Sequence, residues 1–367
     1  MKLLRMLLAV LFLLAVLMPM ACATDEVEAA QWDAIDTQSI EDAAQDAGVG
    51  LKLGQDFDLQ EGLAQVVSLM GETLQKAVGA ATKSAILLLV VVLFCETVGM
   101  FFATAKGQAE SITALVGALA VTTIAVTDVS SLIGMAQSSI QRIAEFAKLL
   151  IPVLTACSAA TGAVTAATAR QAATLLLANV LLTLIERVLI PFVYLYVGAC
   201  AACAALGNEG LGTVAKLFRW CIHTILTTSL LLFTIYLSLT NFAAAGADAV
   251  AIKLTRTVIS SLVPVVGGIL SDASETVLAG AGLVRNTVGL FGVVAVLAWC
   301  VGPFLYLGAQ YLAYRVVAVL SSLVSGGKTA KLIEQISGAF GLVLGMTGAV
   351  ALLVMISLFA TLSVVVT

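Results

Sequence analysis

The sequence has few charged residues, few aromatic residues and a single histidine. Charged residues make up 11% of its 367 residues, less than half of the share of about 25% that is typical of soluble domains. Hydrophobic residues make up 61%. This composition excludes an ordinary soluble domain. It predicts an all-α polytopic membrane protein, because each helical span needs only about 20 mostly apolar residues.

The scarcity of histidine also limits the chemistry that the chain can perform. His223 has no second histidine for a zinc site, and no Ser-His-acid triad can be assembled around it. We interpret it as a hydrogen-bonded interface residue, with a proton relay as the alternative. The seven cysteines form no disulfide framework, and Cys200 and Cys203 are typical of small packing residues on a helix. We expect no enzyme activity, no cofactor and no bound metal.

The sequence also lacks a phosphate-binding loop and a basic surface for nucleic acid. Gly327-Lys328-Thr329 is similar to the end of a phosphate-binding loop, but Ser322 stands where that motif needs glycine, and no strand pattern precedes it. We interpret Lys328 and Lys331 as part of a solvated loop between spans. No stripe of lysine and arginine indicates a nucleic-acid partner.

The N-terminus has the three parts of a cleaved secretory signal peptide. Lys2 and Arg5 form a charged start, residues 7–17 are apolar, and residues 21–23 form an Ala-x-Ala cleavage site. We therefore predict a signal peptide over residues 1–23. The mature N-terminus would then lie outside the cytoplasm.

Residues 24–83 form an acidic segment, with 12 acidic and three basic residues. Its first part, to residue 58, is polar and lacks a core of its own. From Leu59 to Ala77, apolar residues recur at helical spacing, which predicts an amphipathic helix. We expect this helix to pack on the chain's own membrane domain. The alternative is docking to a partner or to the bilayer surface.

Residues 84–367 form the predicted membrane domain, with about six to eight membrane segments. A polar surface helix is expected at residues 141–148. The hydrophobic runs that predict single spans are residues 84–103, 112–134, 149–169, 220–241, 288–313 and 338–365.

The run from residue 172 to residue 206 is too long for one ordinary span. Glu186, Arg187 and Pro191 interrupt it near its middle, where charge is costly in lipid and proline removes a helix hydrogen bond. We expect two short helices that form a re-entrant hairpin. A hairpin places five cations on the cytoplasmic side, in keeping with the positive-inside rule, whereas a single crossing moves them outside: Lys216, Arg219, Arg315, Lys328 and Lys331.

Four charged residues inside hydrophobic runs are candidates for a functional role. Glu186 and Arg187 point about 100° apart on a helix and cannot pair with each other. Asp128 and Glu96 are candidate partners for them on other segments. The alternative is that Glu186 and Arg187 sit at a polar break near the membrane surface.

Two glycine patterns are candidates for structural roles. Pro264, Gly267 and Gly268 predict a sharp break between two short helices, which would place Asp272 and Glu275 on an exposed or pore-facing surface. The alternative is one continuous helix with a small kink. In the last span, glycines at steps of three, four and three share one helix face and predict a tight helix–helix contact inside the chain or between chains: Gly338, Gly341, Gly345 and Gly348.

One stretch of the sequence resembles a known family. Residues 258–292, VISSLVPVVGGILSDASETVLAGAGLVRNTVGLFG, are similar to the C-terminal signature of the stage III sporulation protein AE family. The shared features are the Pro264 to Gly268 turn, the Ser271-Asp272 pair and Asn286. Residues 149–167 resemble another region of that family, with Pro152 and Gly162 as markers.

The resemblance implies a role in endospore formation. It implies a non-enzymatic, multi-pass protein of the mother-cell membrane around the forespore, within a secretion-like channel complex that links the two cells. The implied partners are other subunits of that complex, including a separate ATPase, together with membrane lipid and a possible second copy of this chain. A secondary transporter or permease that uses its intramembrane charges is the alternative, and a membrane peptidase is a more distant one.

Overall fold

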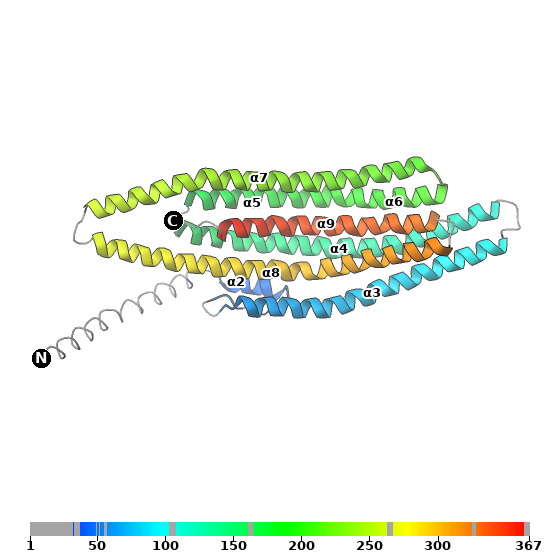
Figure 1. Ribbon diagram of the computed structural model, residues 1–367, viewed down its shortest axis with the longest axis horizontal. Helices are drawn as coiled ribbons and strands as arrows, with labels where there is room; N and C mark the ends of the chain where they lie inside the picture. Colours follow the sequence, from blue (N-terminus) through cyan, green and yellow to red (C-terminus); the bar gives the residue numbers. More distant parts are fainter. Residues whose placement is uncertain are drawn as a thin grey trace.

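The computed structural model is a bundle of long helices that lie side by side (Figure 1). It describes Trp32 and residues 37–48, 50, 52–54, 57–102, 108–160, 164–262, 267–324 and 328–362, and these residues include no β-strand. The helices are α2 (Thr37–Gln45), α3 (Leu59–Phe102), α4 (Gln108–Ala160), α5 (Val164–Leu184), the π-helix η1 (Ile185–Leu189), α6 (Ile190–Leu206), α7 (Glu209–Leu262), α8 (Gly267–Val324) and α9 (Lys328–Leu362).

The long helices run alternately in opposite directions along the bundle (Figure 1). α6 and α7 are joined by a tight turn in which Gly207 has a left-handed conformation (φ 66°) and donates its N–H to the carbonyl of Cys203. A residue with a side chain would be strained at this angle. We call this end of the bundle the Gly207 end. α3 and α8 also finish there, and α4 and α9 begin there.

Six segments of the bundle are long and apolar enough to cross a membrane. They confirm an all-α fold with six candidate membrane spans. The predicted signal peptide lies outside the described residues. The six segments are Leu59–Val98, Leu115–Ala160, Leu175–Leu206, Glu209–Tyr236, Ala281–Val324 and Thr329–Phe359.

The core of the bundle lies around α8 and α9. These two helices pack extensively against each other, and α3 and α4 cover them. Tyr314 of α8 and Phe340 of α9 are both buried and meet edge to face, with ring centroids 4.9 Å apart. Edge-to-face contacts of this kind stabilise a packed interface beyond the effect of burial alone.

The structure corrects the prediction of separate helices between residues 112 and 169. Residues 108–160 form the single helix α4, which continues through Pro152. The polar residues that predicted a surface helix find partners on other segments. Arg142 lies 4.9 Å above the Trp299 ring and 3.8 Å from the Asp46 carboxylate, and Gln141 bonds to Glu186. The helix therefore does not need to leave the bundle at these positions.

The re-entrant hairpin predicted for residues 172–206 is wrong. α5, η1 and α6 follow one another along one helical path (Figure 1). The interruption is absorbed by a π-helical turn at Ile185–Leu189, where the Ile190 N–H donates to the carbonyl five residues earlier. Pro191, which has no N–H to donate, is the second residue of α6 and directly follows this turn.

Together, these two corrections leave the predicted side of most basic residues unchanged. One expected crossing is lost between residues 112 and 169, and a second is lost when the hairpin becomes a single rod. Lys216, Arg219, Arg315 and Lys331 therefore still share one end of the bundle, the Gly207 end. Arg170 lies in α5, which begins at the opposite end.

The predicted amphipathic helix is the first part of α3, and only a narrow strip of it faces the bundle. Val66 and Ala77 are buried. Leu63, Met70 and Leu74, which we also expected to pack inward, are more than 40% exposed. Most of the apolar face of this segment is therefore not covered by the chain itself.

The break predicted near residue 264 falls between two helices, but these helices are long and not short as predicted. α7 ends at Leu262 and α8 begins at Gly267, and Pro264 lies outside the described residues. Gly267, Gly268 and Asp272 are in the first turns of α8. The direction of the Asp272 side chain stays a prediction.

Candidate functional site

A buried polar cluster joins α4 to α8. The Asp128 carboxylate accepts two hydrogen bonds on the same oxygen, from Gln310 Nε2 at 2.7 Å and from Tyr314 Oη at 2.8 Å. Gln310 and Tyr314 are 5% and 0% exposed. Inside a membrane bundle, such bonds hold helices together because the polar groups have no water to bond instead. The cluster thus acts as a clamp between two spans.

The other predicted intramembrane charges do not join this cluster. Glu186, in η1, accepts a hydrogen bond from Gln141 Nε2 of α4 at 2.6 Å. Arg187 is exposed, and within the described part of the chain it makes no ion pair. Glu96, on α3, is half-buried. The structure therefore gives Glu186 a partner different from the predicted Asp128 or Glu96.

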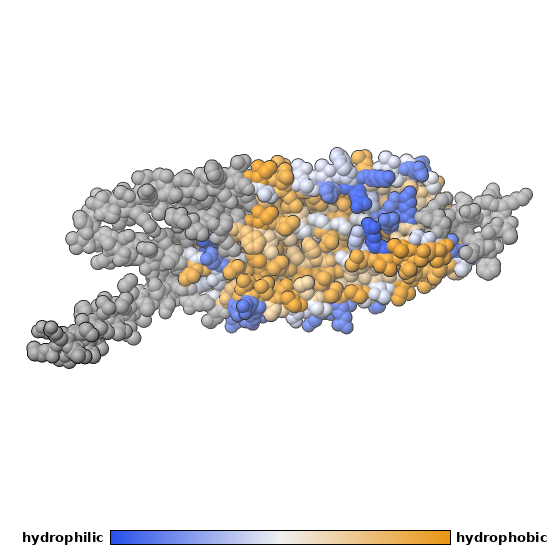
Figure 2. Space-filling view, viewed as in Figure 1, coloured by the Kyte–Doolittle hydropathy of each residue, from blue (hydrophilic) through white to orange (hydrophobic). Residues whose placement is uncertain are grey.

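Near the Gly207 end, four basic side chains gather around one cavity of about 230 Å³. Lys216 and Arg219 come from α7, Arg315 from α8 and Lys331 from α9. Glu334 is the only acidic residue among those that line it. Figure 2 shows hydrophilic residues collected over this part of the bundle, beside a hydrophobic middle region. We call these four basic residues and Glu334 the cationic cavity.

The basic residues differ in how they are held. Arg315 lies 3.4 Å from the Glu334 carboxylate and 5.6 Å from the centroid of the Tyr311 ring. Lys216, Arg219 and Lys331 make no ion pair with any described residue. Three cations are thus available to a negatively charged ligand.

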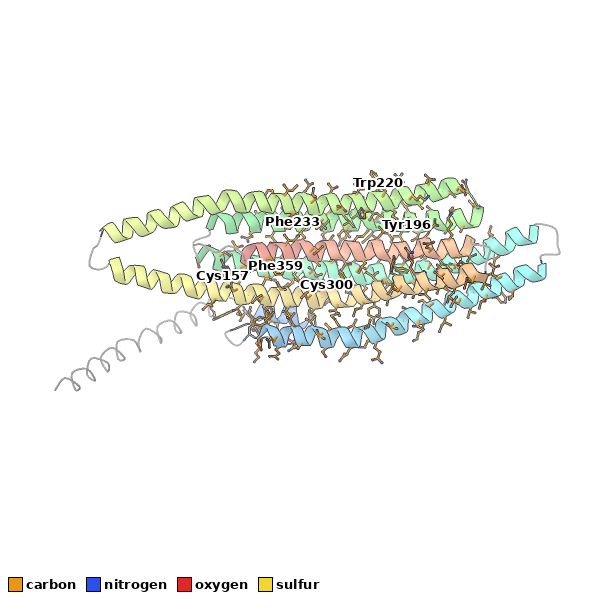
Figure 3. All side chains as sticks on the ribbon, in the orientation of Figure 1. Cys157, Tyr196, Trp220, Phe233, Cys300 and Phe359 are labelled. Carbon is orange, nitrogen blue, oxygen red and sulfur yellow. The ribbon has the colours of Figure 1, made fainter. Side chains whose placement is uncertain are left out.

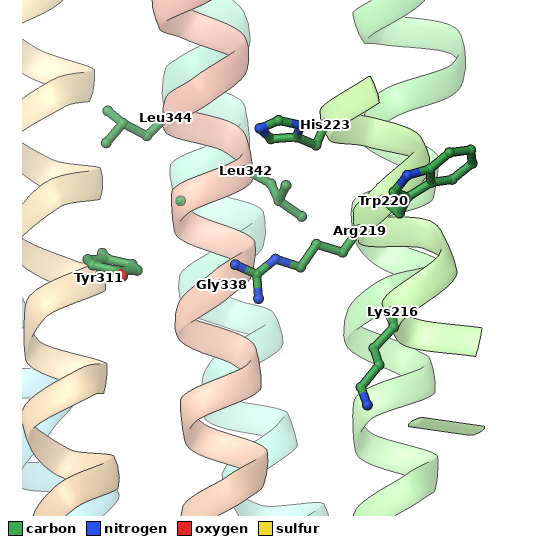
Figure 4. Close-up of a pocket in the computed structure, with 9 residues that line it drawn as sticks. Lys216, Arg219, Trp220, His223, Tyr311, Gly338, Leu342 and Leu344 are labelled. Atoms are coloured by element: carbon green, nitrogen blue, oxygen red, sulfur yellow. The ribbon is translucent and has the colours of Figure 1, made fainter. Parts of the chain in front are cut away.

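A second hollow, of about 540 Å³, adjoins the cationic cavity and shares Lys216, Arg219, Tyr311 and Gly338 with it. Arg219 reaches from α7 towards Gly338 on α9, and Tyr311 faces them from α8 (Figure 4). His223 also lines this hollow, and its side chain is exposed. Both of our interpretations of His223, as an interface residue and as a proton relay, therefore stay untested.

Gly338 occupies the tightest position of the predicted glycine face. It is buried, and a Cβ atom built on it would lie 2.9 Å from the hydroxyl of Tyr196. That hydroxyl donates to the Gln335 carbonyl at 2.5 Å and so fixes α6 against α9. Figure 3 shows Tyr196 in the half of the bundle near the Gly207 end. Glycine at 338 permits this close approach.

The rest of the glycine face borders an open apolar groove of about 670 Å³. A Cβ atom on Gly345 would find its nearest neighbour only at 4.0 Å, and one on Gly341 at 3.7 Å. Within the chain, the glycine face is therefore packed less closely at these two positions than at Gly338. Val343, on the opposite face of α9, is 3% exposed, so that face is packed within the chain. A contact between chains at this face stays a prediction.

From the sequence, the basic residues of the cationic cavity were identified only as topology markers, and Lys331 was wrongly placed in a solvated loop, whereas it lies in the first turn of α9. The pattern that reveals the cavity is the spacing Lys216, Arg219 and His223, at steps of three and four, which puts all three on one face of α7. Arg315 and Lys331 could not be connected to that face without the packing of α8 and α9. The described residues include no group of three His, Cys, Asp or Glu residues that could hold a metal.

Comparisons with known proteins give one consistent family. A family model described as Stage III sporulation protein AE matches residues 52–365. The protein named Stage III sporulation protein AE of Bacillus subtilis (strain 168) is 25% identical over 226 residues. That alignment covers 62% of this chain and 57% of that protein, so the match spans less than two thirds of the relative's length. No solved structure matches the chain.

Proposed function

The chain belongs to the stage III sporulation protein AE family, and we propose that it is a non-enzymatic membrane subunit of a channel complex between mother cell and forespore. The observation that carries this proposal is the family match, which extends over nearly the whole helical bundle. By this proposal the protein works in the mother-cell membrane that surrounds the forespore. It contributes helices and docking surfaces, and a separate subunit supplies ATP hydrolysis.

The exposed apolar surface of α3 supports a role as a subunit. Val67 and Val78 are 66% and 49% exposed, and with Leu63 and Leu74 they form an exposed apolar stripe along the helix. Charged residues such as Glu72 and Lys76 lie on the same segment. Lipid tails would not solvate these charges, whereas a neighbouring protein can cover the stripe and leave them in water.

The arrangement of charge supports one orientation. The Gly207 end holds Lys216, Arg219, Arg315 and Lys331, so by the positive-inside rule we assign it to the cytoplasm. With six crossings, the acidic residues 24–58 and the end of α9 then share the opposite side. This agrees with a cleaved signal peptide that delivers the mature N-terminus across the membrane.

Purification of the tagged full chain from sporulating cells tests the proposal. We expect other membrane proteins of the complex and an ATPase to co-purify with it. Val67→Lys should reduce their recovery because it places a charge within the exposed stripe of α3. Gln75→Lys adds the same charge at another exposed position of the same helix, and serves as the matched control. The proposal fails if the chain purifies alone and cells without it form normal spores.

The same purification distinguishes a subunit of a complex from a transporter that works alone. A carrier that works by itself would need no partner, and its transport would depend on an intramembrane charge. Asp128→Asn removes that charge and keeps an acceptor for Tyr314. Recovery of the complex with this variant, together with normal sporulation, would support the subunit role over an ion path through Asp128.

A further inference from the structure

Three hollows near α9 form one continuous surface. The cationic cavity shares Tyr311 and Gly338 with the second hollow. That hollow in turn shares Gly341 and Leu344 with the apolar groove. A ligand that fills all three must therefore be negatively charged at one end and apolar over the rest of its length.

The charged end of this surface suits a phosphate group. Four cations and one carboxylate line it, which leaves an excess of three positive charges. Arg219 offers a planar group that can bond two phosphate oxygens at once, and Lys216 and Lys331 add mobile ammonium groups. Since none of these three forms an ion pair among the described residues, an anion would not have to displace a carboxylate from them.

Aromatic residues indicate that these cations lie at the level of lipid headgroups. Tyr194 and Trp220 flank the α6–α7 turn symmetrically, each 13 residues from Gly207, and they are 41% and 63% exposed. Exposed Tyr and Trp side chains concentrate where a membrane meets water. Arg219 precedes Trp220 directly and Lys216 lies one turn away, so both belong to the same level.

The apolar end is long enough to hold an acyl chain. Along α9 it runs from Gly341 to Met355, about 21 Å at 1.5 Å per residue. One leaflet of a bilayer has a hydrocarbon depth of about 15 Å, half of the total core. Gly345 and Gly348 have no side chains, and Phe304 of α8 and Leu352 of α9 form the apolar wall.

We propose that this surface binds one anionic glycerophospholipid. Its phosphate lies between Lys216, Arg219 and Lys331, and an acyl chain lies along the groove at Gly341, Gly345 and Gly348. A free phosphate ion would leave the groove unfilled, and a neutral lipid would leave three cations without a partner. The lipid fills space between α7 and α8 that α9 leaves open, and so completes the packing of the bundle.

Lipid binding to the purified, delipidated full chain tests this assignment. Native mass spectrometry would compare phosphatidylglycerol with phosphatidylcholine of identical acyl chains, and with glycerol 3-phosphate, which has the phosphate but no chains. We expect one phosphatidylglycerol to bind at least tenfold more tightly than either of the others. Lys216→Gln together with Arg219→Gln should weaken it roughly 25-fold, about fivefold for each cation near an anionic lipid.

One further variant tests the acyl-chain part. Gly345→Leu fills the groove, so it should weaken phosphatidylglycerol binding and leave the weak binding of glycerol 3-phosphate unchanged. Lys76→Gln and Gly134→Leu are matched controls, since Lys76 is an exposed cation on α3 and Gly134 an exposed glycine on α4 with no atom within 4 Å of an added Cβ. Lys216→Arg with Arg219→Lys keeps the charge and should retain most of the binding.

Three results would overturn the assignment. The first is equal affinity for phosphatidylglycerol and phosphatidylcholine. The second is unchanged preference in the double glutamine variant while its helical content and thermal stability match the parent. The third is a double variant that keeps its lipid but loses a co-purifying protein, which would assign the cations to an acidic segment of a partner.

Discussion

The helices α9 and α3 are almost equally apolar, yet they hold very different places in the bundle. In the most hydrophobic 18-residue stretch of α9, 56% of the residues are buried inside the protein, whereas in the corresponding stretch of α3 the share is 17%. Hydropathy alone therefore does not tell an inner helix from an outer one, because lipid is as apolar as a core. The difference lies in contacts: α9 is packed by α4, α6, α7 and α8, and α3 mainly by α8.

The largest effect should come from removing a large side chain from the inner helix. Phe340→Ala deletes a ring that is 1% exposed and packs on Tyr314, so it leaves a cavity. We expect a loss of about 3 kcal/mol in the free energy of unfolding, measured by thermal or chemical unfolding in detergent. Phe94→Ala on α3 deletes a ring that is 67% exposed and should cost far less. Equal losses would end the distinction between the two helices.

The glycine face of α9 offers a comparison within a single helix. Gly338→Leu forces a side chain against the Tyr196 hydroxyl and should cost about 1–3 kcal/mol through overpacking. Gly345→Leu extends into the open groove, where its nearest neighbour lies 4.0 Å away, and should leave the thermal stability of the delipidated protein nearly unchanged. If Gly345→Leu is as destabilising as Gly338→Leu, the groove is closed in solution.

A smaller effect is expected at the clamp between α4 and α8. Tyr314→Phe removes one of the two hydrogen bonds to Asp128 and leaves the ring in place. Interhelical hydrogen bonds in membranes contribute about 1 kcal/mol, so the melting temperature should fall modestly. Tyr194→Phe changes a 41% exposed tyrosine of α6 and is the control. If Tyr314→Phe leaves the melting temperature unchanged, burial of the ring alone joins these helices.

The smallest effect belongs to the exposed side of α9. Glu334→Gln breaks the ion pair with Arg315, whose side chains are 56% and 50% exposed. Exposed ion pairs contribute about 0–1 kcal/mol, so unfolding of this variant in detergent should be close to that of the parent. A loss as large as that from Phe340→Ala would mean that the pair is shielded from water.

Composition and hydrophobic runs were sufficient to predict the helical class and to locate most spans. They failed where a polar residue has a partner that is distant in sequence. Gln141 and Glu186 each predicted an interruption, but they bond to each other between two continuous helices. A hydrophobicity pattern predicts that each of these polar residues lies outside the membrane. It contains no information that the two side chains form a hydrogen bond with each other.

The candidate site was predicted only in part, for the same reason. The glycines of α9 were identified from their spacing, but their neighbours were not. Gly338 meets Tyr196 of α6, while Gly345 faces a groove, although both have the same place in the sequence pattern. The cationic cavity draws on α7, α8 and α9, and only packing brings its members together.

The π-helical turn in the rod from α5 to α6 has a further consequence for how this chain can vary. Ile185 and Ile190 are both buried, and they lie five residues apart where an α-helix would place such neighbours four apart. The turn therefore holds one additional residue without changing which side of α5 or of α6 faces the core. In length, the rod is one residue longer than a regular α-helix that would present the same buried faces. A relative that lacks one residue here, for example the exposed Arg187, would have a regular α-helix with the same buried face.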